Sequence, residues 1–355
     1  MHSLANVYRG GQIESTHTGS IVVVDSSGRL LAFAGDPGTV ICLRSAAKPF
    51  QAIPLIEYGG VAEYDLSGED IALMCGSHGG EPFHVARAAA LLRKGEFDES
   101  DLLCGTHFPY DEKTANDLRA AGEEPSPLHN NCSGKHAGML LATEVMDAPS
   151  EDYVAAGHPL QVLCRHTLSE FCGVAAEEIP IAIDGCGVPA YFLTLHRAAW
   201  AYARLMATTE GMQTTGALSR YEESASHVVE AMTAFPEYVA GRWSITTPLM
   251  DAFGGGMLAK EGAEGFYAMG LSSSLSSELT ERLRVDDHST VGIALKIDDG
   301  SMGRGRNPVI LRTLELLGID LAARPQLAPH RAWPVTSVTG KPVGEVRSEF
   351  ELEIL

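Results

Sequence analysis

The chain has 355 residues, of which 45% are hydrophobic and 20% charged, so it is long enough to bury a sizeable core. Its formal net charge of −20 disfavours binding to nucleic-acid backbones and anionic membranes. No run of about 18 apolar residues predicts a membrane span, and the N-terminal segment lacks the apolar core of a secretory signal. We therefore expect a cytoplasmic protein whose seven cysteines are reduced thiols.

The N-terminal part of the chain predicts strands and then a helix. Residues 20–35 predict two strands around a Ser-Ser-Gly turn, and residues 39–43 predict a third. A helix is expected to start at Ser45, and Pro54 is expected to shorten or kink it.

The middle of the chain predicts mostly helices. One helix starts at Ser67, with Asp70 at the position of a capping box, and ends in a glycine-rich turn. Residues 179–183 predict one buried strand. Further helices are expected over residues 81–95, 133–146, 158–173, 190–206 and 219–235.

Strands return towards the C-terminus. They are expected over residues 265–271 and 290–299, followed by a helix over 307–317 and a final edge strand within 346–355. Strands thus cluster at both ends of the sequence. We expect one α/β domain over residues 1–355, with a mixed sheet of N- and C-terminal strands flanked by helices and a helical subregion at roughly 60–250.

The stretch "LRSAAKPFQ" places Ser45 one helical turn before Lys48. Side chains on a helix lean towards its N-terminus, so the Lys48 amine is expected near the Ser45 hydroxyl. This S-x-x-K arrangement suits a serine nucleophile with a lysine base. The pattern is short, and by itself it more often marks a helix start with a solvated lysine.

Two further stretches carry groups that such chemistry needs. "CGSHGGEPFH" sets Ser77 in a glycine-rich turn whose backbone amides suit an oxyanion site, or which simply ends a helix. "FGGGMLAKEGAEGF" brings Lys260 into a glycine-rich turn before a strand, like the late-strand lysine of S-x-x-K enzymes. The alternative for Lys260 is a solvated charge in a hairpin.

Two cysteines lie in glycine-rich turns. "HNNCSGKHAG" contains Cys132, Lys135 and His136, and "DGCG" contains Cys186. Two such thiols could together hold a soft metal such as zinc. No C-x-x-C pair is present, so the spacing is not that of a zinc finger, and buried thiols without metal are the alternative.

These stretches together resemble the Rhizobium etli-type L-asparaginases, the asparaginase II family. The motifs occur in family order over residues 44–308: "RSAAKPFQAIPL", "CGSHGGEPFH", "HNNCSGKHAGML", "DGCGVPAY", "LMDAFGGGMLAKEGAEG" and "GRGRNP". The resemblance implies a fold similar to that of serine β-lactamases and glutaminases. It also implies hydrolysis of L-asparagine to L-aspartate and ammonia, and a homodimer.

The resemblance assigns roles residue by residue. It implies one Ser–Lys pair from Ser45 and Lys48 and a second from Ser77 and Lys260, with Ser45 the favoured nucleophile and Ser77 left open. Substrate contacts are implied for Arg44, towards the carboxylate, and for Asp184, towards the ammonium group. The implied zinc ligands are Cys132, Lys135 and Cys186, with His136 beside the metal and the substrate.

Three other functions remain open from the sequence. The first is a glutaminase or another Ser–Lys acyl-transfer amidase of the same fold. The second is a zinc-binding or amino-acid-binding protein without turnover. The third is a zinc hydrolase with Cys132, Cys186 and His136 as ligands. As partners we expect the small-molecule substrate L-asparagine, and neither nucleic acid nor a membrane.

Overall fold

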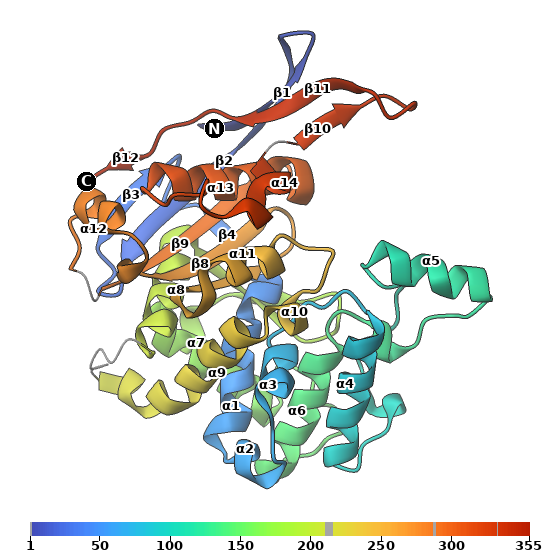
Figure 1. Ribbon diagram of the computed structural model, residues 1–355. Helices are drawn as coiled ribbons and strands as arrows, with labels where there is room; N and C mark the ends of the chain where they lie inside the picture. Colours follow the sequence, from blue (N-terminus) through green and yellow to red (C-terminus); the bar gives the residue numbers. More distant parts are fainter. Residues whose placement is uncertain (1, 210–215, 287–288, 332) are drawn as a thin grey trace. The chain divides into compact units, whose positions relative to one another are not determined.

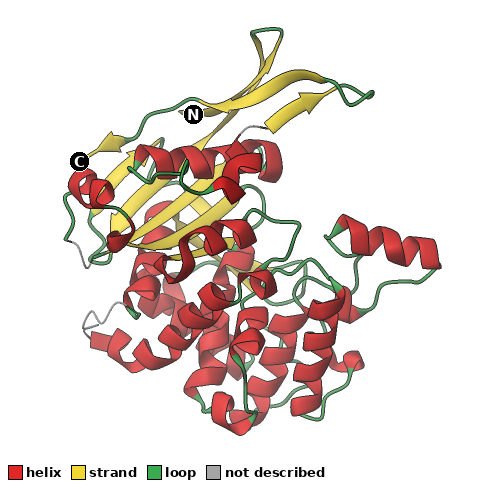
Figure 2. Cartoon of the chain, viewed as in Figure 1, coloured by secondary structure: helices red, strands yellow, loops and turns green. Residues whose placement is uncertain are grey.

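The computed structural model describes residues 2–209, 216–286, 289–331 and 333–355. The chain forms two compact units. The sheet unit comprises Met1–Leu43, Leu193–Met212 and Ala252–Leu355, and the helical unit comprises Arg44–Phe192 and Gln213–Asp251. Figure 2 shows that most strands belong to the first unit and most helices to the second. The single domain expected over residues 1–355 stays a prediction.

The sheet unit is built on one large sheet, coloured blue and orange to red in Figure 1 because both chain ends supply it. Its strands are β1 (His2–Arg9), β2 (Gln12–Asp25), β3 (Leu30–Ala34), β7 (Met257–Glu261), β8 (Phe266–Ser272), β9 (Thr290–Ile297), β10 (Trp333–Thr336), β11 (Pro342–Ser348) and β12 (Glu353–Ile354). The main path runs β10-β11-β1-β2-β9-β8-β7, and β3 pairs with both β2 and β12.

This topology confirms the α/β fold class and the expectation that N- and C-terminal strands share a sheet. Every recorded pair in this sheet is antiparallel, so the strand directions are not mixed as expected. The final edge strand expected over residues 346–355 is confirmed only in part. β11 lies between β10 and β1, and only the two-residue β12 extends the sheet beyond β3.

The strands at the N-terminus are longer than the sequence suggests. No apolar run in the sequence predicted β1, yet it pairs with β2 from His2 to Arg9 and with β11 from Ala5 to Arg9. The run Ile21–Val24 of β2 is fully buried, because β2 has strand neighbours on both sides and a helix packs on it. A continuous β-branched run is typical of such a buried central strand.

Helix α8 (Leu195–Ala207) packs on β2, β8 and β9. Glycines in the sheet permit this close approach. A Cβ at Gly292 would lie 1.9 Å from the Ala199 carbonyl oxygen, and one at Gly270 would lie 2.6 Å from that of Tyr202. Residues 190–194, expected to be helical, instead belong to strand β6 (Pro189–Thr194), and the helix starts only at Leu195.

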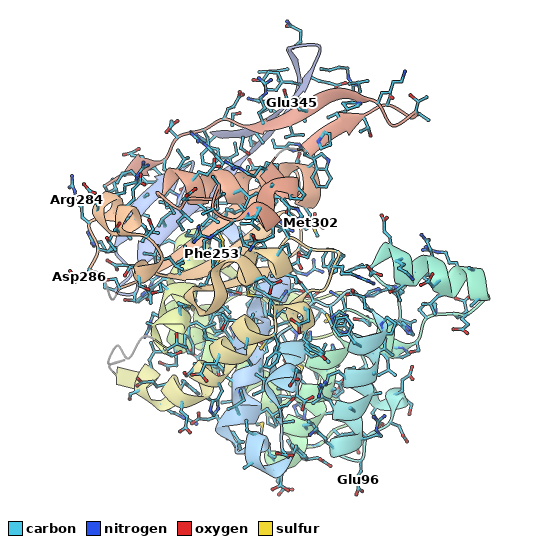
Figure 3. The ribbon with its side chains drawn as sticks, in the orientation of Figure 1. Glu96, Phe253, Arg284, Asp286, Met302 and Glu345 are labelled. Atoms are coloured by element: carbon cyan, nitrogen blue, oxygen red, sulfur yellow. The ribbon has the colours of Figure 1, made fainter. Side chains whose placement is uncertain are left out.

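Three further helices belong to the sheet unit: α12 (Ser277–Leu283), α13 (Asn307–Leu316) and α14 (Ala328–Arg331). Helix α13 packs against β1 and β11. Before it lies a π-helical segment, η8 (Met302–Arg306), whose first residue is labelled in Figure 3. A short strand, β4 (Val40–Cys42), ends just before the helical unit begins.

The helical unit contains α1 (Lys48–Glu57), α2 (Gly60–Glu63), α3 (Gly68–Met74), α4 (Pro82–Lys94), α5 (Glu112–Ala121), α6 (Ser133–Val145), α7 (Pro159–Cys172), α9 (Glu222–Ala234), α10 (Pro236–Val239) and most of α11 (Thr246–Phe253), with the hairpin strands β5 (Ile181–Ile183) and β6. Helix α1 contacts α6, α7 and α9, and side chains fill the space between these helices (Figure 3). No helix of the described residues is long and apolar enough to cross a membrane.

Local sequence explains how the helices that carry the site begin. Helix α3 starts at the predicted capping box, because the Ser67 hydroxyl accepts from the Asp70 amide and the Asp70 carboxylate accepts from the Ser67 amide. Helix α1 starts at Lys48, three residues later than expected, after the 3₁₀ turn η1 (Arg44–Ala47). It continues through Pro54 to Glu57, so the proline does not end it.

Candidate active site

Ser77 lies in the turn that follows α3, and its backbone is held on both sides. The Ser77 N–H donates to the Val239 carbonyl at 2.7 Å, and the Trp243 indole N–H donates to the Ser77 carbonyl at 3.3 Å. The glycines of this turn are needed for its shape. A Cβ at Gly76 would lie 2.6 Å from the Tyr238 carbonyl oxygen, and Gly80 has φ +75°.

His78 stabilises the same turn from inside. Its Nδ1 accepts from the Gly80 amide, and its Nε2 lies 2.8 Å from the hydroxyl of Ser133, the first residue of α6. The Ser133 hydroxyl donates to the Leu128 carbonyl, so the Nε2 is the donor in this pair. Burial holds the pKa of His78 well below its usual range. The imidazole is therefore neutral and connects the turn to α6.

The Lys48 amine reaches across to this turn. Its Nζ lies 3.0 Å from the Ser77 hydroxyl, 2.5 Å from the Gly76 carbonyl oxygen and 3.3 Å from the Asn131 carbonyl oxygen. Only 1% of Lys48 is exposed. An ammonium group offers three donors to these atoms, and a neutral amine offers two N–H groups to the carbonyls and a lone pair to the hydroxyl. The contacts therefore accommodate both protonation states that a general base alternates between.

Ser45 lies in the 3₁₀ turn just before α1 and is half-buried. No hydrogen bond of its hydroxyl is recorded within the described part of the chain. The Lys48 amine contacts Ser77 rather than the expected Ser45. The structure thus places Ser45, Lys48 and Ser77 in one unit, with Lys48 bonded to the second serine.

Arg44 and Asp184 form an ion pair in this unit. The Arg44 Nε and Nη2 atoms lie 2.9 and 2.8 Å from the Asp184 Oδ1 atom. Burial would raise the pKa of Asp184, but the Arg44 hydrogen bond and the charges of Lys135 and Arg44 hold it below its usual value. The two residues expected to hold a substrate's charged groups are therefore adjacent.

Cys132, Lys135 and Cys186 form a buried cluster. Each is at most 6% exposed, and the Lys135 Nζ lies 3.0 Å from the Cys186 Sγ. The hydrogen bond from Cys186, together with the Lys48 and Lys135 charges, holds the pKa of Cys132 well below its usual value despite burial. Burial opposes the charge of Lys135, but the two thiols raise its pKa. The cluster without a metal thus stabilises a thiolate beside an ammonium group.

This donor set fits a soft metal ion, since two sulfur atoms and one nitrogen atom meet in a buried place. Among the described residues, no group of three or more His, Cys, Asp and Glu side chains is arranged to hold a metal. A metal here therefore requires the lysine nitrogen as a ligand. None of the seven cysteines, all within the described ranges, forms a disulfide.

His136 is completely buried on α6. Its Nδ1 lies 2.7 Å from the Tyr153 hydroxyl, which also accepts from the Leu103 amide. Burial holds the pKa of His136 well below its usual range. His136 directly follows Lys135 in the chain, and its expected role towards the substrate stays a prediction.

Lys260 belongs to the sheet unit, in strand β7. It is fully buried, and its Nζ donates to the Glu261 carbonyl at 3.2 Å. The solvated lysine of the alternative interpretation is thereby excluded. The expected Ser77–Lys260 pair joins residues of different units and stays a prediction.

Sequence patterns did not indicate Asn131 and Trp243. Asn131 contributes a carbonyl to Lys48, and Trp243 donates to the Ser77 carbonyl. Asn131 directly precedes Cys132 in the stretch "HNNCSGKHAG". A closer look at the asparagines of that stretch could therefore have identified it. Nothing in the local sequence around Trp243 distinguishes it from a core tryptophan.

Comparisons with known proteins give a family and a group of structures. The model of the L-asparaginase II family matches residues 5–348. No match is found among the curated proteins. Crystal structures of a protein named Mglu are similar in fold. Its native form is 17% identical with a TM-score of 0.45, covering 85% of this chain and 65% of that one. Its glutamate form is 17% identical with a TM-score of 0.44, covering 84% and 60%. The chain thus spans 60 to 65% of the length of these two Mglu chains.

Proposed function

The chain belongs to the L-asparaginase II family, a family of amidohydrolases, and we propose that it hydrolyses L-asparagine to L-aspartate and ammonia by Ser–Lys catalysis. The observation that carries this proposal is the hydrogen bond between the buried Lys48 amine and the Ser77 hydroxyl. Ser45, which is more exposed than Ser77, lies three residues before Lys48 in the chain. A buried lysine amine can take a proton from one serine hydroxyl and pass it to a second one to which it is bonded.

In this mechanism Ser45 is the nucleophile. Neutral Lys48 takes the Ser45 proton as the oxygen attacks the side-chain amide carbon. The Lys48–Ser77 hydrogen bond then provides a route for that proton to the departing nitrogen, which leaves as ammonia. Water hydrolyses the β-aspartyl ester on Ser45, with Lys48 again as the base. Lys260 would assist the proton transfer through Ser77.

The glycine-rich turn supplies candidate oxyanion donors. The Ser77 and Gly80 amides already donate to the Val239 carbonyl and to the His78 imidazole. For the His78 and Gly79 amides, no acceptor is recorded among residues that the structure describes. These two N–H groups are the ones available to a developing oxyanion, at about 2.7–4 kcal/mol for each effective donor.

Arg44 and Asp184 would bind the amino-acid end of the substrate. The guanidinium suits the α-carboxylate and the aspartate suits the α-ammonium group. Their existing ion pair keeps both charges satisfied before the substrate arrives. A zwitterionic α-amino acid can then bind both groups without leaving either charge unpaired.

Cys132, Lys135 and Cys186 would hold a zinc ion, with His136 beside them. A bound zinc ion supplies a Lewis acid that can orient a substrate. The Lys135 amine would bind it only when neutral, since an ammonium group has no lone pair. A homodimer in the cytoplasm, as the resemblance and the composition indicate, completes the proposal.

The experiment is an ammonia-release assay of the purified chain with L-asparagine and L-glutamine. We expect faster turnover of L-asparagine, and loss of nearly all activity in Ser45→Ala. The matched control is Ser169→Ala, which removes a hydroxyl on α7 that donates to the carbonyl one turn earlier, and which should stay active.

Each alternative function predicts a different result in this assay. Faster turnover of L-glutamine would indicate the glutaminase. Asparagine binding without ammonia would indicate a binding protein. Activity lost completely on chelation but retained by Ser45→Ala would indicate the zinc hydrolase.

A further inference from the structure

Three aromatic side chains in the helical unit form a row next to the Ser77–Lys48 pair. The Trp243 and Tyr110 rings are 5.0 Å apart, and the Tyr110 and His107 rings are stacked at 4.9 Å with an angle of 18° between their planes. Tyr110, in the middle, is 46% exposed. No catalytic step described above uses any of these three rings.

One end of the row holds the Ser77 turn. The Trp243 indole donates to the Ser77 carbonyl, and a Cβ at Gly79 would lie 3.1 Å from its Cδ1 atom. The Asp111 amide, next to Tyr110, donates to the Gly79 carbonyl at 3.0 Å. Trp243 and the backbone amide that follows Tyr110 thus hold the carbonyls on both sides of His78.

The other end of the row holds the residue that contacts the lysine. The His107 Nδ1 lies 2.7 Å from the Phe108 carbonyl oxygen and donates to it, so Nε2 is the acceptor. This Nε2 accepts from the Asn131 amide at 3.1 Å. The Asn131 carbonyl in turn accepts from Lys48. His107 therefore positions Asn131, whose carbonyl accepts the hydrogen bond from the Lys48 amine.

These contacts close a ring. It runs from Ser77 through Trp243, Tyr110, His107 and Asn131 to Lys48, and the 3.0 Å bond from Lys48 returns it to the Ser77 hydroxyl. Two ion pairs anchor the segment that carries Trp243, because Arg242 lies 2.7 Å from a Glu81 oxygen and 3.1 Å from an Asp111 oxygen. The row is thereby tied to the N-terminal ends of α4 and α5.

We propose that Trp243, Tyr110 and His107 act as one aromatic support that positions Ser77 and Lys48 relative to each other for proton transfer. This inference rests on the proposed function, since the proton route runs through that pair. All three are positioning residues, because they act through Ser77 and Asn131. Proton transfer is sensitive to small displacements, so loosening the support lowers kcat more than it raises KM.

The first test is Trp243→Phe, which keeps a ring against Tyr110 but removes the N–H donor. Losing one neutral hydrogen bond to the turn should lower kcat for L-asparagine about five- to tenfold, with KM within about twofold. His107→Phe, at the other end, should lower kcat similarly. Because both act on one pair, the double variant should lose less than the product of the two single losses.

The matched control is Trp200→Phe. The Trp200 indole donates to the Ser26 carbonyl at 2.9 Å in the sheet unit, so this variant loses the same kind of bond elsewhere. Its kcat should equal that of the parent even where its stability falls. Tyr110→Leu gives a variant that folds readily, since the side chain is half exposed, and it should lower kcat by a smaller factor.

Hydrogen exchange of residues 75–80 gives a second readout that needs no turnover. The Ser77 amide should exchange about tenfold faster in Trp243→Phe than in the parent and in Trp200→Phe. If kcat and the Ser77 exchange rate in Trp243→Phe equal those of the parent, the proposal of an aromatic support is refuted. A parent chain that releases no ammonia from either amide would reject the proposed function instead, and the exchange rates would still decide whether the support holds the turn.

Discussion

Arg44 adopts a backbone conformation that residues other than glycine rarely adopt, with φ 48°. It does so at the junction where the chain enters the helical unit, and its guanidinium bonds to Asp184, 140 residues further along the chain. Such strain persists only where surrounding contacts maintain it, and it is frequent where binding groups must be aimed. The Asp184 contact is one reason why Arg44 keeps this conformation.

We predict that Arg44→Ala lowers the free energy of unfolding by about 1–2 kcal/mol at pH 7, because it leaves a mostly buried carboxylate without its partner. Arg44 holds the pKa of folded Asp184 below its usual value. The pair therefore stabilises the fold above that usual value, near pH 4, and the stabilisation disappears as the pH falls through the lower folded pKa.

Urea unfolding of the parent and Arg44→Ala at pH 7 and at pH 3 measures this difference. The two proteins should differ at pH 7 and approach each other at pH 3. If Arg44→Ala lowers the free energy of unfolding equally at pH 7 and at pH 3, the ion pair contributes nothing to stability and the variant has lost only packing.

Glycines in α6 allow this helix to pack closely on α3, so that the elements carrying the candidate site lie together. Helix α6 carries Lys135 and begins directly after Cys132. A Cβ on Gly134 would lie 2.5 Å from the Leu73 Cγ, and one on Gly138 would lie 2.4 Å from the Met74 Sδ. Helix α6 therefore packs directly on the end of α3, where the Ser77 turn starts, and this places the thiol cluster beside the Ser77–Lys48 pair.

For the zinc site we predict that Cys132→Ser and Cys186→Ser lose most of the metal bound by the parent, since each removes one sulfur ligand. Elemental analysis of the purified proteins measures this. Cys164→Ser is the matched control, because Cys164 is an equally buried thiol on α7 whose Sγ contacts the Gln51 carbonyl of α1. Full zinc content in both cluster variants, or equal loss in Cys164→Ser, would refute the assignment.

Elements could be predicted where the signal is local. The capping box of α3 was readable from neighbouring residues, and α7 lies within the residues 158–173 that its apolar spacing predicted. The partner of Lys48 was not, because Ser77 is 29 residues away and the helix rule favoured Ser45. A lysine stem is long enough to reach another loop, where the buried Gly76 carbonyl and the partly buried Asn131 carbonyl accept hydrogen bonds from its amine.

At the scale of the whole molecule, sheet membership was predictable and sheet order was not. The clustering of strands at both ends indicated a shared sheet, since long apolar strands must find partners. The position of β11 between β10 and β1 depends on pairings across more than 300 residues, such as Ala5 with Ser348. Lys260 illustrates the same limit, because local glycines suggested a turn where the structure has strand β7.

Buried histidines give the helical unit a defined response to acid. His78, His84 and His136 are all buried, and burial lowers the pKa of each. In the unfolded chain they take up protons near pH 6.5, whereas in the folded chain they stay neutral to lower pH. The unfolded state therefore binds more protons in this window, and the free energy of unfolding falls as the pH falls below about 6.5.

We predict that in His84→Gln the free energy of unfolding decreases less steeply as the pH is lowered. Burial lowers the pKa of folded His84 from 6.5 to about 4, which corresponds to on the order of 3 kcal/mol over that window. Unfolding measured between pH 7 and pH 4.5 should show a smaller slope for His84→Gln than for the parent. His166→Gln, at an exposed histidine of α7, should keep the parent slope. A parent-like slope in His84→Gln would contradict this account.

The most direct test of the account is to identify the serine that carries the acyl group. The parent enzyme is mixed with L-asparagine, quenched with acid within milliseconds to seconds, digested and mapped by mass spectrometry. The account predicts a β-aspartyl ester on the peptide that contains Ser45, none in Ser45→Ala, and accumulation of the ester in variants that slow hydrolysis. Sustained release of ammonia with neither Ser45 nor Ser77 ever acylated would contradict Ser–Lys catalysis by this chain.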